Sequence, residues 1–585
     1  MIPPAIRVNG SWRIGSICSS GLEPTRMPSA HERRAPEHLV RLAAGLFLAI
    51  GLLLQGWRIW SLNATYDQGL FLQEIWNGQL GRPFESTLAS QLSSPVLVRG
   101  DALPTLGYFH LGQHFTPLLM VWLPLVMLLG IWSLPLIQVG LLTAGGLVLH
   151  QLARADLPAR LAAWIACSYF AAGIVIGPAL ENFHDLCAIP LLSFGLLLGI
   201  RRNNPWLYGS CALLLPFVRE DVGLLSFSFG LWMLLRCRGR WRWAGLGLCV
   251  YSALMVVAIT NVWMPLFGTE VADRFMEERF GQFLVAQNGR GSTLDVLKAM
   301  AAQPLLLLQE LLLPLGPTLK FLITLWLPLA FLPAAGIDGW LLMAGPLFVA
   351  LSSQGSNALA VNLRFVLYLV PGVFAGAILW WQRHPTLFHE RWLKRLWRTA
   401  LVLSIVFTIT GNPHRSLSAL IPDSVQPWVY VSPWRQLQRG WETRALLSSI
   451  PADASVAAET QLVPLLAQRR VLLRFPESSA YTDERKQELP AQWVVSQPGF
   501  NADYAPAFRR NAVWVRRSQA KIAELLESGT YRVHRCDQRG IVLRHVQTGT
   551  HQVGEPSDST GASCVTAQFD QVLLQMKQRG DASLR

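Results

Sequence analysis

Ionisable side chains recur at the ends of the apolar segments of this chain, and no apolar segment carries one near its centre. They are Asp67 and Glu74, His110 and His114, Glu181, His184 and Asp185, Arg219, Glu220 and Asp221, and Arg364. A carboxylate can take a proton from an attacking hydroxyl group, and cationic side chains or a bound metal ion can stabilise a departing phosphate. Although a single such residue is more often a solvated helix end, ionisable groups collected at membrane level commonly mark function. The pattern suits chemistry on a lipid-linked substrate.

Composition identifies the chain as an integral membrane protein. Of its 585 residues, 51% are hydrophobic and only 15% are charged, and the mean hydropathy is +0.32. The formal net charge is +14, which in a soluble protein would raise the question of nucleic acid. Here Lys and Arg fall in short loops between apolar segments, as the positive-inside rule requires, so no nucleic-acid partner is predicted. No phosphate-binding Gly-rich loop, HExxH or GxSxG motif is present, and ATP-driven and zinc-protease functions have no support.

The elements that position these side chains are predicted membrane-crossing apolar segments. Residues 1–38 form a polar tail, and the basic residues before the first apolar segment place the N-terminus in the cytoplasm. With every basic loop inside, residues 39–411 are predicted to cross the membrane about eleven times, which leaves the C-terminus outside. The predicted crossings are 39–62, one net crossing within 115–152, 161–180, 186–200, 206–218, 222–235, 243–264, 321–332, 340–351, 365–381 and 400–410. The predicted fold class is mainly α, a polytopic transmembrane bundle of the cytoplasmic membrane.

Segments outside the crossings carry the remaining organisation. Residues 63–114 form an external loop in which 67–80 repeats apolar residues at helical intervals, which indicates an amphipathic helix on the membrane surface. A second external segment is predicted over 265–316. A linker over 412–446 leads to a small α/β domain over 447–548, which is expected to fold by itself and to contain a hairpin formed by 531–534 and 541–544. A flexible tail covers 549–585. Cys536 and Cys564 could pair if this domain is exported, and the sequence leaves that open.

A series of spaced motifs runs through residues 40–548. The first members are Tyr66-Asp67-Gln68-Gly69, Gln73, Trp76-Asn77, Gly81-Arg82-Pro83-Phe84, Leu111-Gly112, His114-Phe115 and Pro117. The later members are Phe183-His184, Arg219-Glu220-Asp221, the run from Ile450 to Val456, Val463-Pro464 and Arg469. In this order they resemble an uncharacterised family of bacterial and archaeal predicted membrane proteins. That family resembles the GT-C superfamily of membrane glycosyltransferases, which use polyprenyl-phosphate sugars and place an acidic residue in the first external loop.

The resemblance implies a GT-C-like fold and matches Asp67 to the catalytic acidic position. Asp67 would act as a general base on an acceptor hydroxyl, in an inverting transfer of a sugar from a polyprenyl-phosphate donor at the outer membrane face. The predicted substrate-binding residues are Gln73, Asn77, Arg82, His114, His184, Arg219, Glu220, Asp221 and Arg364. No cofactor is assigned, apart from a divalent metal ion that the acidic residues could hold. One departure is that Arg364-Phe365, with Pro371, stands where the superfamily pattern has a His-Tyr pair before a Pro.

Two other classes of function stay open. A transporter or lipid flippase is typically built from related halves with Gly/Pro-broken spans and polar groups near the mid-membrane. Here Pro is frequent, but the ionisable groups sit at span ends and no repeat is visible. A scaffold without chemistry of its own would tolerate Asp67→Ala without a phenotype. The partners predicted are membrane lipid and a polyprenyl-phosphate-linked sugar, whereas the sugar, the acceptor and the oligomeric state are not assigned.

Overall fold

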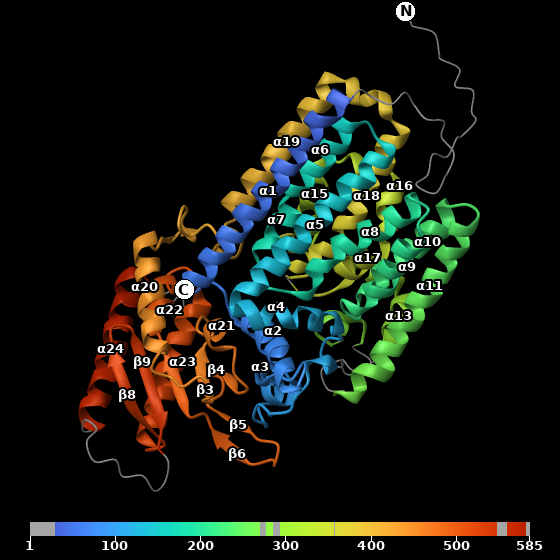
Figure 1. Cartoon of the computed structure of the whole chain (residues 1–585). Coiled ribbons are helices and arrows are strands. Elements are labelled where there is room, and N and C mark those ends of the chain that lie inside the picture. The colour runs from blue at the N-terminus through green and yellow to red at the C-terminus, as the bar shows by residue number, and fades with distance from the viewer. Residues whose placement is uncertain (1–29, 269–276, 285–292, 356, 547–557, 581–585) are drawn as a thin grey trace, which may run out of the picture.

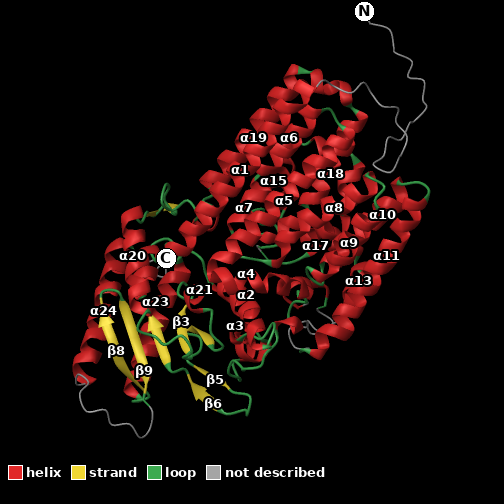
Figure 2. Cartoon of the chain, viewed as in Figure 1, coloured by secondary structure: helices red, strands yellow, loops and turns green. Residues whose placement is uncertain are grey.

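The computed structural model describes residues 30–268, 277–284, 293–355, 357–546 and 558–580. It consists of a helical bundle and of an α/β domain beside one end of that bundle (Figure 1). Figure 2 shows that the strands are confined to the C-terminal part. Most of the predicted polar tail lies outside the described residues, and its last part already belongs to the first helix, which begins at Ala30.

The bundle consists of helices of very different length. Its helices are α1 (Ala30–Trp60), α5 (Ser133–Asp156), α6 (Ala159–Phe170), α7 (Gly173–Leu180), α8 (Ile189–Arg201), α9 (Pro205–Leu214), α10 (Val222–Arg236), α11 (Arg240–Ala258), α15 (Leu315–Trp326), α16 (Ile337–Leu342), α17 (Ala344–Ser352), α18 (Val370–Arg383) and α19 (Arg391–Thr410). On α1, Leu42, Leu46, Ile50 and Leu53 are exposed at helical spacing. Such an apolar stripe on the outside of a bundle is what contact with lipid requires.

The number of bilayer-length spans is lower than the number of predicted crossings. In the described ranges, four helical stretches are long and apolar enough to cross a membrane, or up to six if two bent helix pairs each count as one span. The four are Pro36–Trp60, Pro117–Asp156, Arg240–Leu266 and Arg364–Arg383. Several other predicted crossings are shorter helices, such as α8 with 13 residues. At 1.5 Å per residue such a helix covers only about two thirds of a hydrocarbon core of about 30 Å.

The first predicted external loop folds back under the C-terminal domain. It contains α2 (Tyr66–Asn77) and α3 (Thr87–Gln91). Nearly every residue of α2 is buried, so the prediction of an amphipathic helix on the membrane surface is wrong. One face of α2 packs on α4 (Leu123–Leu129) and another on α21 (Val463–Leu466) of the C-terminal domain. The contact is so close that a Cβ atom on Gly69 would lie 2.5 Å from Val463.

The second predicted external segment, 265–316, lies only partly within the described residues. Its described part contains α13 (Thr293–Ala302) and α14 (Pro304–Leu312). Helix α14 and the stretch Leu315–Leu329 meet at 61° and together pass the length and composition test for one span. The end of the predicted external segment is therefore apolar enough to belong to the bundle.

The C-terminal domain is built on a five-stranded mixed sheet in the order β4-β3-β7-β9-β8. Its strands are β3 (Val456–Glu459), β4 (Leu472–Phe475), β7 (Trp493–Ser496), β8 (Tyr531–Asp537) and β9 (Gly540–His545), with β4, β3 and β7 parallel and β9 and β8 antiparallel to their neighbours. The predicted hairpin is confirmed, with Arg532 opposite Arg544. A separate antiparallel pair, β5 (Ala480–Thr482) and β6 (Glu488–Pro490), lies beside this sheet.

The two faces of this sheet have different neighbours. One face packs under α22 (Pro498–Tyr504) and α23 (Arg509–Glu527) through residues such as Val494, Ile522 and Leu543. Residues of the other face, including Val456 and Leu472, belong to the same continuous core as the bundle. The domain thus shares part of its core with the membrane part.

Helix α3 covers the edge strand of the sheet with side chains. The Thr87 hydroxyl donates to the Leu472 carbonyl at 2.8 Å and accepts the Leu472 N–H at 3.0 Å. Gln91 repeats this pattern on Arg474, accepting its N–H at 2.6 Å and donating to its carbonyl at 3.3 Å. Exposed edge strands invite unwanted pairing, and here two side chains one helical turn apart satisfy β4 instead. The same bonds fix the domain to the first loop.

The predicted linker, 412–446, is ordered structure. It contains the hairpin of β1 (Ser424–Val425) and β2 (Trp428–Val429) and most of α20 (Pro433–Leu447). Helix α20 crosses the end of α1, where the Arg444 guanidinium lies 3.9 Å from the Trp60 ring centroid. A Cβ atom on Gly440 would meet the Trp60 side chain at 2.5 Å, which explains the glycine. The sequence did not predict this ordered structure, because a close contact between distant residues has no local sequence signal.

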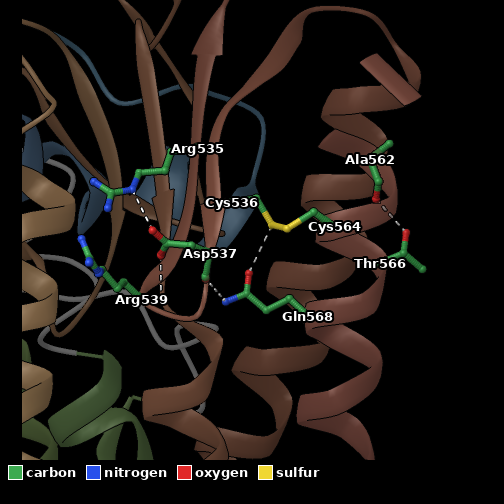
Figure 3. The surroundings of a disulfide bond; sticks show 8 residues. All are labelled: Arg535, Cys536, Asp537, Arg539, Ala562, Cys564, Thr566 and Gln568. Atoms are coloured by element: carbon green, nitrogen blue, oxygen red, sulfur yellow. Dashed lines mark hydrogen bonds and ion pairs between the residues drawn. A yellow bond between two sulfur atoms is a disulfide. The ribbon is translucent and has the colours of Figure 1, made fainter. Parts of the chain in front are cut away.

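The predicted flexible tail also contains a helix. Helix α24 (Asp558–Arg579) places Val565, Phe569, Val572 and Met576 into the domain core, at spacings of four, three and four residues. This amphipathic repeat is the physical reason that the tail prediction was wrong for these residues. Residues 549–557 and 581–585 lie outside the described residues. Cys564 on α24 forms a disulfide with Cys536 on β8, and the Gln568 amide donates to the Asp537 carbonyl beside it at 3.1 Å (Figure 3).

Candidate active site

Asp67 lies in the first turn of α2, and its carboxylate is paired with an arginine from a distant part of the chain. Arg364 Nη2 is 2.6 Å from Asp67 Oδ2. Arg364 also approaches Glu181, whose Oε2 accepts the Arg364 backbone N–H at 2.5 Å and whose Oε1 lies 3.6 Å from Arg364 Nε. The guanidinium therefore bridges two carboxylates. The Asp67 side chain remains 34% exposed, so a ligand can reach it.

Hydrogen bonds fix the start of α2 against the turn that follows α7. Asn182 Oδ1 accepts the Thr65 N–H at 3.1 Å, and Asn182 Nδ2 donates to the Thr65 hydroxyl at 2.8 Å. Gln68 Oε1 accepts the Phe183 N–H at 2.6 Å. Because these bonds flank both Asp67 and Glu181, the distance between the two carboxylates is set by the backbone of both elements.

A second charged group stands at the start of α10. Arg219 binds Asp221 in a bidentate arrangement, with Nε 3.0 Å from Oδ1 and Nη2 2.8 Å from Oδ2, and the Tyr368 hydroxyl donates to the same carboxylate. Asp185 Oδ2 lies 3.9 Å from Arg219 Nε. Although burial opposes ionisation, the Arg219 guanidinium lowers the pKa of Asp221. This carboxylate is thus held as an anion that orients Arg219.

Phe365 connects the two charged groups and borders a cavity. The guanidinium carbons of Arg219, Arg279 and Arg364 lie 5.6, 5.8 and 5.8 Å from its ring centroid, within the range of cation–π attraction. The cavity has a volume of about 390 Å³. Its lining residues are Asp221, Leu224, Glu278, Arg279, Pro346, Val349, Ala350, Ser353, Gln354, Gly355, Asn357, Ala358, Phe365 and Tyr368. One ligand could therefore meet arginine, amide and apolar side chains together.

Two histidine–glutamate pairs lie where the first loop enters the bundle. His114 Nδ1 is 2.8 Å from Glu220 Oε1, and His110 Nδ1 is 2.7 Å from Glu74 Oε1. The two rings are perpendicular, 5.7 Å apart. Burial lowers the pKa of His114 despite Glu220, whereas at His110 the effect of burial is exceeded by the Glu74 carboxylate, which raises the pKa. Burial therefore shifts His114 toward the neutral form, whereas Glu74 shifts His110 toward the imidazolium.

His184 does not line the cavity. Its side chain is fully buried, and Nε2 lies 3.2 Å from the Pro178 carbonyl. Burial holds the pKa of His184 well below its usual range, so the ring is neutral. Its backbone N–H donates to Gln138 Oε1 at 3.1 Å. His184 thus packs inside the turn and lies outside the cavity lining, and its contact with substrate stays a prediction.

Three predicted substrate-binding residues of the first loop contact other parts of the protein instead. Gln73 Nε2 donates to the carbonyls of Arg469 and Arg470 at 3.1 and 3.2 Å. Asn77 Nδ2 donates to the Glu85 carbonyl at 2.8 Å. Arg82 pairs with Glu85 at 3.1 Å and with Glu484 of the C-terminal domain. Gln73 and Arg82 thus join the first loop to the C-terminal domain, whereas Asn77 bonds within the loop.

The site contains residues that were not among the predicted substrate-binding set. Glu181 and Asp185 flank the Phe183-His184 motif, so their position in the sequence could have predicted that they belong to the site. Phe365 and Tyr368 look like ordinary members of an apolar segment, and Arg279 belongs to no motif. Among the described residues, no three His, Cys, Asp or Glu side chains come together as a metal site. The cations that contact Asp67 and Asp221 there are guanidinium groups.

Comparisons with known proteins add a family and one distant structure. A family model described as "Predicted membrane protein (DUF2079)" matches residues 58–543. None of the curated proteins matches the chain. A solved structure described as the crystal structure of ArnT from Cupriavidus metallidurans bound to undecaprenyl phosphate matches with 13% sequence identity. The match covers 88% of this chain and 99% of the ArnT chain, with a TM-score of 0.43. At this level of similarity, no residue role is carried over from ArnT to this chain.

Proposed function

Because this chain belongs to the DUF2079 family of predicted membrane proteins and holds an accessible carboxylate against a cluster of arginines, we propose that it is a membrane glycosyltransferase. It would move a sugar from a polyprenyl-phosphate donor to an acceptor hydroxyl at the outer membrane face. The observation that carries the proposal is the pairing of Asp67 with Arg364 beside Phe365, around which three guanidinium groups gather.

Asp67 acts as the general base in this proposal. The acceptor oxygen attacks the anomeric carbon of the donor and gives its proton to the Asp67 carboxylate. The bond between that carbon and the phosphate oxygen breaks, and the polyprenyl phosphate leaves with the electron pair. Attack opposite the leaving group inverts the anomeric centre. A positioned general base typically contributes a factor of about 10² to 10⁴ in rate.

The arginines stabilise the departing phosphate. Arg364 contacts Asp67 and also borders Phe365, so a phosphate at this ring would lie next to the guanidinium that orients the base. Arg279 lines the cavity from a different segment of the chain. Fixed cations aimed at developing negative charge commonly lower the barrier of such reactions more than any other group does, because they need no reorganisation during the reaction.

The cavity suits an amphipathic donor. Ser353, Gln354 and Asn357 offer polar groups for sugar hydroxyls, while Leu224, Pro346 and Val349 provide an apolar wall. The C-terminal domain is fixed to the loop that carries Asp67, so it is placed to hold an acceptor or to cover the site. His114 and Glu220, which pair where the first loop enters the bundle, are assigned to positioning of that loop.

The test is transfer by the purified full chain in lipid vesicles. A panel of polyprenyl-phosphate hexoses is supplied with a lipid extract as the acceptor source, and mass spectrometry follows release of the free polyprenyl phosphate and gain of one hexose by an extract component. With wild type, we expect release of polyprenyl phosphate and gain of one hexose for at least one donor. With Asp67→Asn, we expect neither product. Failure of every donor would overturn the proposal. Movement of labelled donor across the bilayer without transfer would identify a flippase instead.

A further inference from the structure

Aromatic and apolar side chains form an exposed patch where the bundle passes into the C-terminal domain. The patch, here called the aromatic foot, consists of Leu420, Val425, Trp428, Tyr430 and Trp434. Trp428 is 65% exposed and Trp434 is 80% exposed. Soluble proteins rarely expose several large apolar side chains together without a partner.

Two aromatic members of the foot, Trp428 and Tyr430, follow from an alternation of buried and exposed residues that begins at β2. Along residues 428–431, Val429 and Val431 are buried against Leu62 and Tyr504, while Trp428 and Tyr430 point the other way. Successive side chains of a strand point to opposite faces, so packing of the valines forces the aromatic residues outward. Ser432 then caps α20, which starts with Pro433 and Trp434. The outward direction of these rings is therefore built into the backbone.

The foot continues the exposed apolar side of α19. It follows α19, whose outer side exposes Val402, Val406 and Phe407. It also lies next to the end of α1, because the Trp60 indole N–H donates to the Leu437 carbonyl of α20 at 3.4 Å. Figure 1 shows the hairpin and the start of α20 beside the ends of α1 and α19. Both helices therefore bring the foot to the level at which they leave the bilayer.

We propose that the aromatic foot inserts into the headgroup region of the bilayer beside the bundle and anchors the C-terminal domain to the membrane. The types of residue fit this partner, because Trp and Tyr favour the membrane–water interface, with their rings between acyl chains and headgroups. Arg435, next to Trp434, pairs with Glu442 at 3.4 Å and is still 47% exposed, so a lipid phosphate can reach its guanidinium. The anchor would hold the domain at a fixed height over the loop that carries Asp67.

The test measures the depth of spin labels on the full chain in vesicles of phosphatidylcholine and phosphatidylglycerol. Nitroxides are placed at Trp428→Cys and Trp434→Cys, and their collisions with oxygen and with a water-soluble nickel chelate are compared. Phe407→Cys on α19, with a native side chain 57% exposed, is the lipid reference, and Leu574→Cys on α24, 56% exposed, is the water reference. Wild-type protein treated in the same way gives the background from native thiols.

We expect the ratio of oxygen to nickel collisions at both foot positions to approach that at 407 and to exceed that at 574 by several-fold. Ratios equal to that at 574 would overturn the anchor. Protection from both reagents would also overturn it, since it would show a protein partner or a second copy of the chain on the foot. Each variant must keep the wild-type melting temperature in detergent, and Val425→Cys replaces a position that fails this control.

Discussion

Charged side chains occur at both ends of the bundle, and their surroundings differ. At one end, the charged side chains form a layer, here called the closed layer, that is centred on the buried Asp338. Its carboxylate lies 3.1 Å from Arg236 Nε and 2.5 Å from Arg383 Nη2, and it accepts the Trp232 indole N–H at 2.9 Å. The charged side chains at the other end, where the candidate site lies, are here called the open layer and are Asp67, Glu181, Arg219, Asp221 and Arg364. Helix α10 joins the two layers, starting after Asp221 and ending at Arg236, and its 15 residues span about 22 Å.

The difference between the layers lies in access rather than in charge. Asp338 is 2% exposed and is contacted by two guanidinium groups and an indole N–H of its own chain, so its charge is used within the fold. Asp67 is one third exposed, and Asp221 and Arg279 line a cavity. Charged residues at the end of a bundle are therefore evidence for chemistry only where a ligand can reach them.

Asp67→Asn should have the largest effect on turnover. The amide keeps the size of the side chain but cannot accept the proton, so the rate of hexose transfer should fall by about 10² to 10⁴. The melting temperature in detergent should stay close to that of wild type, because the site is partly exposed and the amide can still accept a bond from Arg364. Wild-type turnover by this variant would exclude Asp67 as the base.

Asp338→Ala should show the opposite pattern. Removing one member of a buried ion pair typically costs about 3–5 kcal/mol, since the remaining charges lose their compensation. Thermal unfolding followed by fluorescence should therefore shift strongly downward, while the protein that remains folded should bind a polyprenyl-phosphate hexose as wild type does. Loss of binding at unchanged stability would contradict the division into two layers.

Glu181 should make stability depend on pH near neutrality. Burial raises its pKa to about 7 against the opposing effect of Arg364. Because the folded pKa lies above the unfolded value, this contribution to stability is complete below about pH 4.5 and is lost as the pH rises through about 7. As the pH rises over this range, the free energy of unfolding of wild type should fall by up to about 3 kcal/mol relative to that of Glu181→Gln. Equal pH profiles of unfolding for both proteins would count against a protonated Glu181.

Arg364→Gln should lower transfer without unfolding the chain. It removes a charge-assisted bond of about 1.5–3 kcal/mol at the proposed phosphate position, which corresponds to about 10- to 100-fold in kcat/KM. Arg364→Lys retains the charge but not the bridge to Glu181, so it should recover only part of the loss. Full activity of Arg364→Gln would place the phosphate elsewhere.

Arg82→Gln should have the smallest effect. Its ion pair with Glu484 joins the first loop to the C-terminal domain, and an exposed pair of this kind contributes little to stability because water and salt screen it. We expect a small decrease in melting temperature and unchanged kcat/KM. A large loss of turnover at normal stability would return Arg82 to the substrate-binding set.

The sequence alone determined the membrane class, the helical fold and the α/β domain, because these depend on local apolar composition and on short-range periodicity. It also indicated the collection of ionisable groups around Asp67, since lipid excludes such groups from the centres of spans. Local patterns did not separate His184 from His114, or Gln73 from Asp67, because burial depends on what packs against a residue.

Only the tertiary structure decided which side chains contact each other and which of them a ligand can reach. Arg364 and Asp67 are almost 300 positions apart, and their contact depends on the turn after α7, where Glu181 accepts the Arg364 backbone N–H and holds Arg364 in place. The cover of α2 by α21, the crossing of α20 over Trp60 and the docking of α24 are long-range contacts in the same sense. A sequence specifies such contacts only through the free energy of the whole packed chain, so no window of neighbouring residues could reveal which carboxylate would face a cavity.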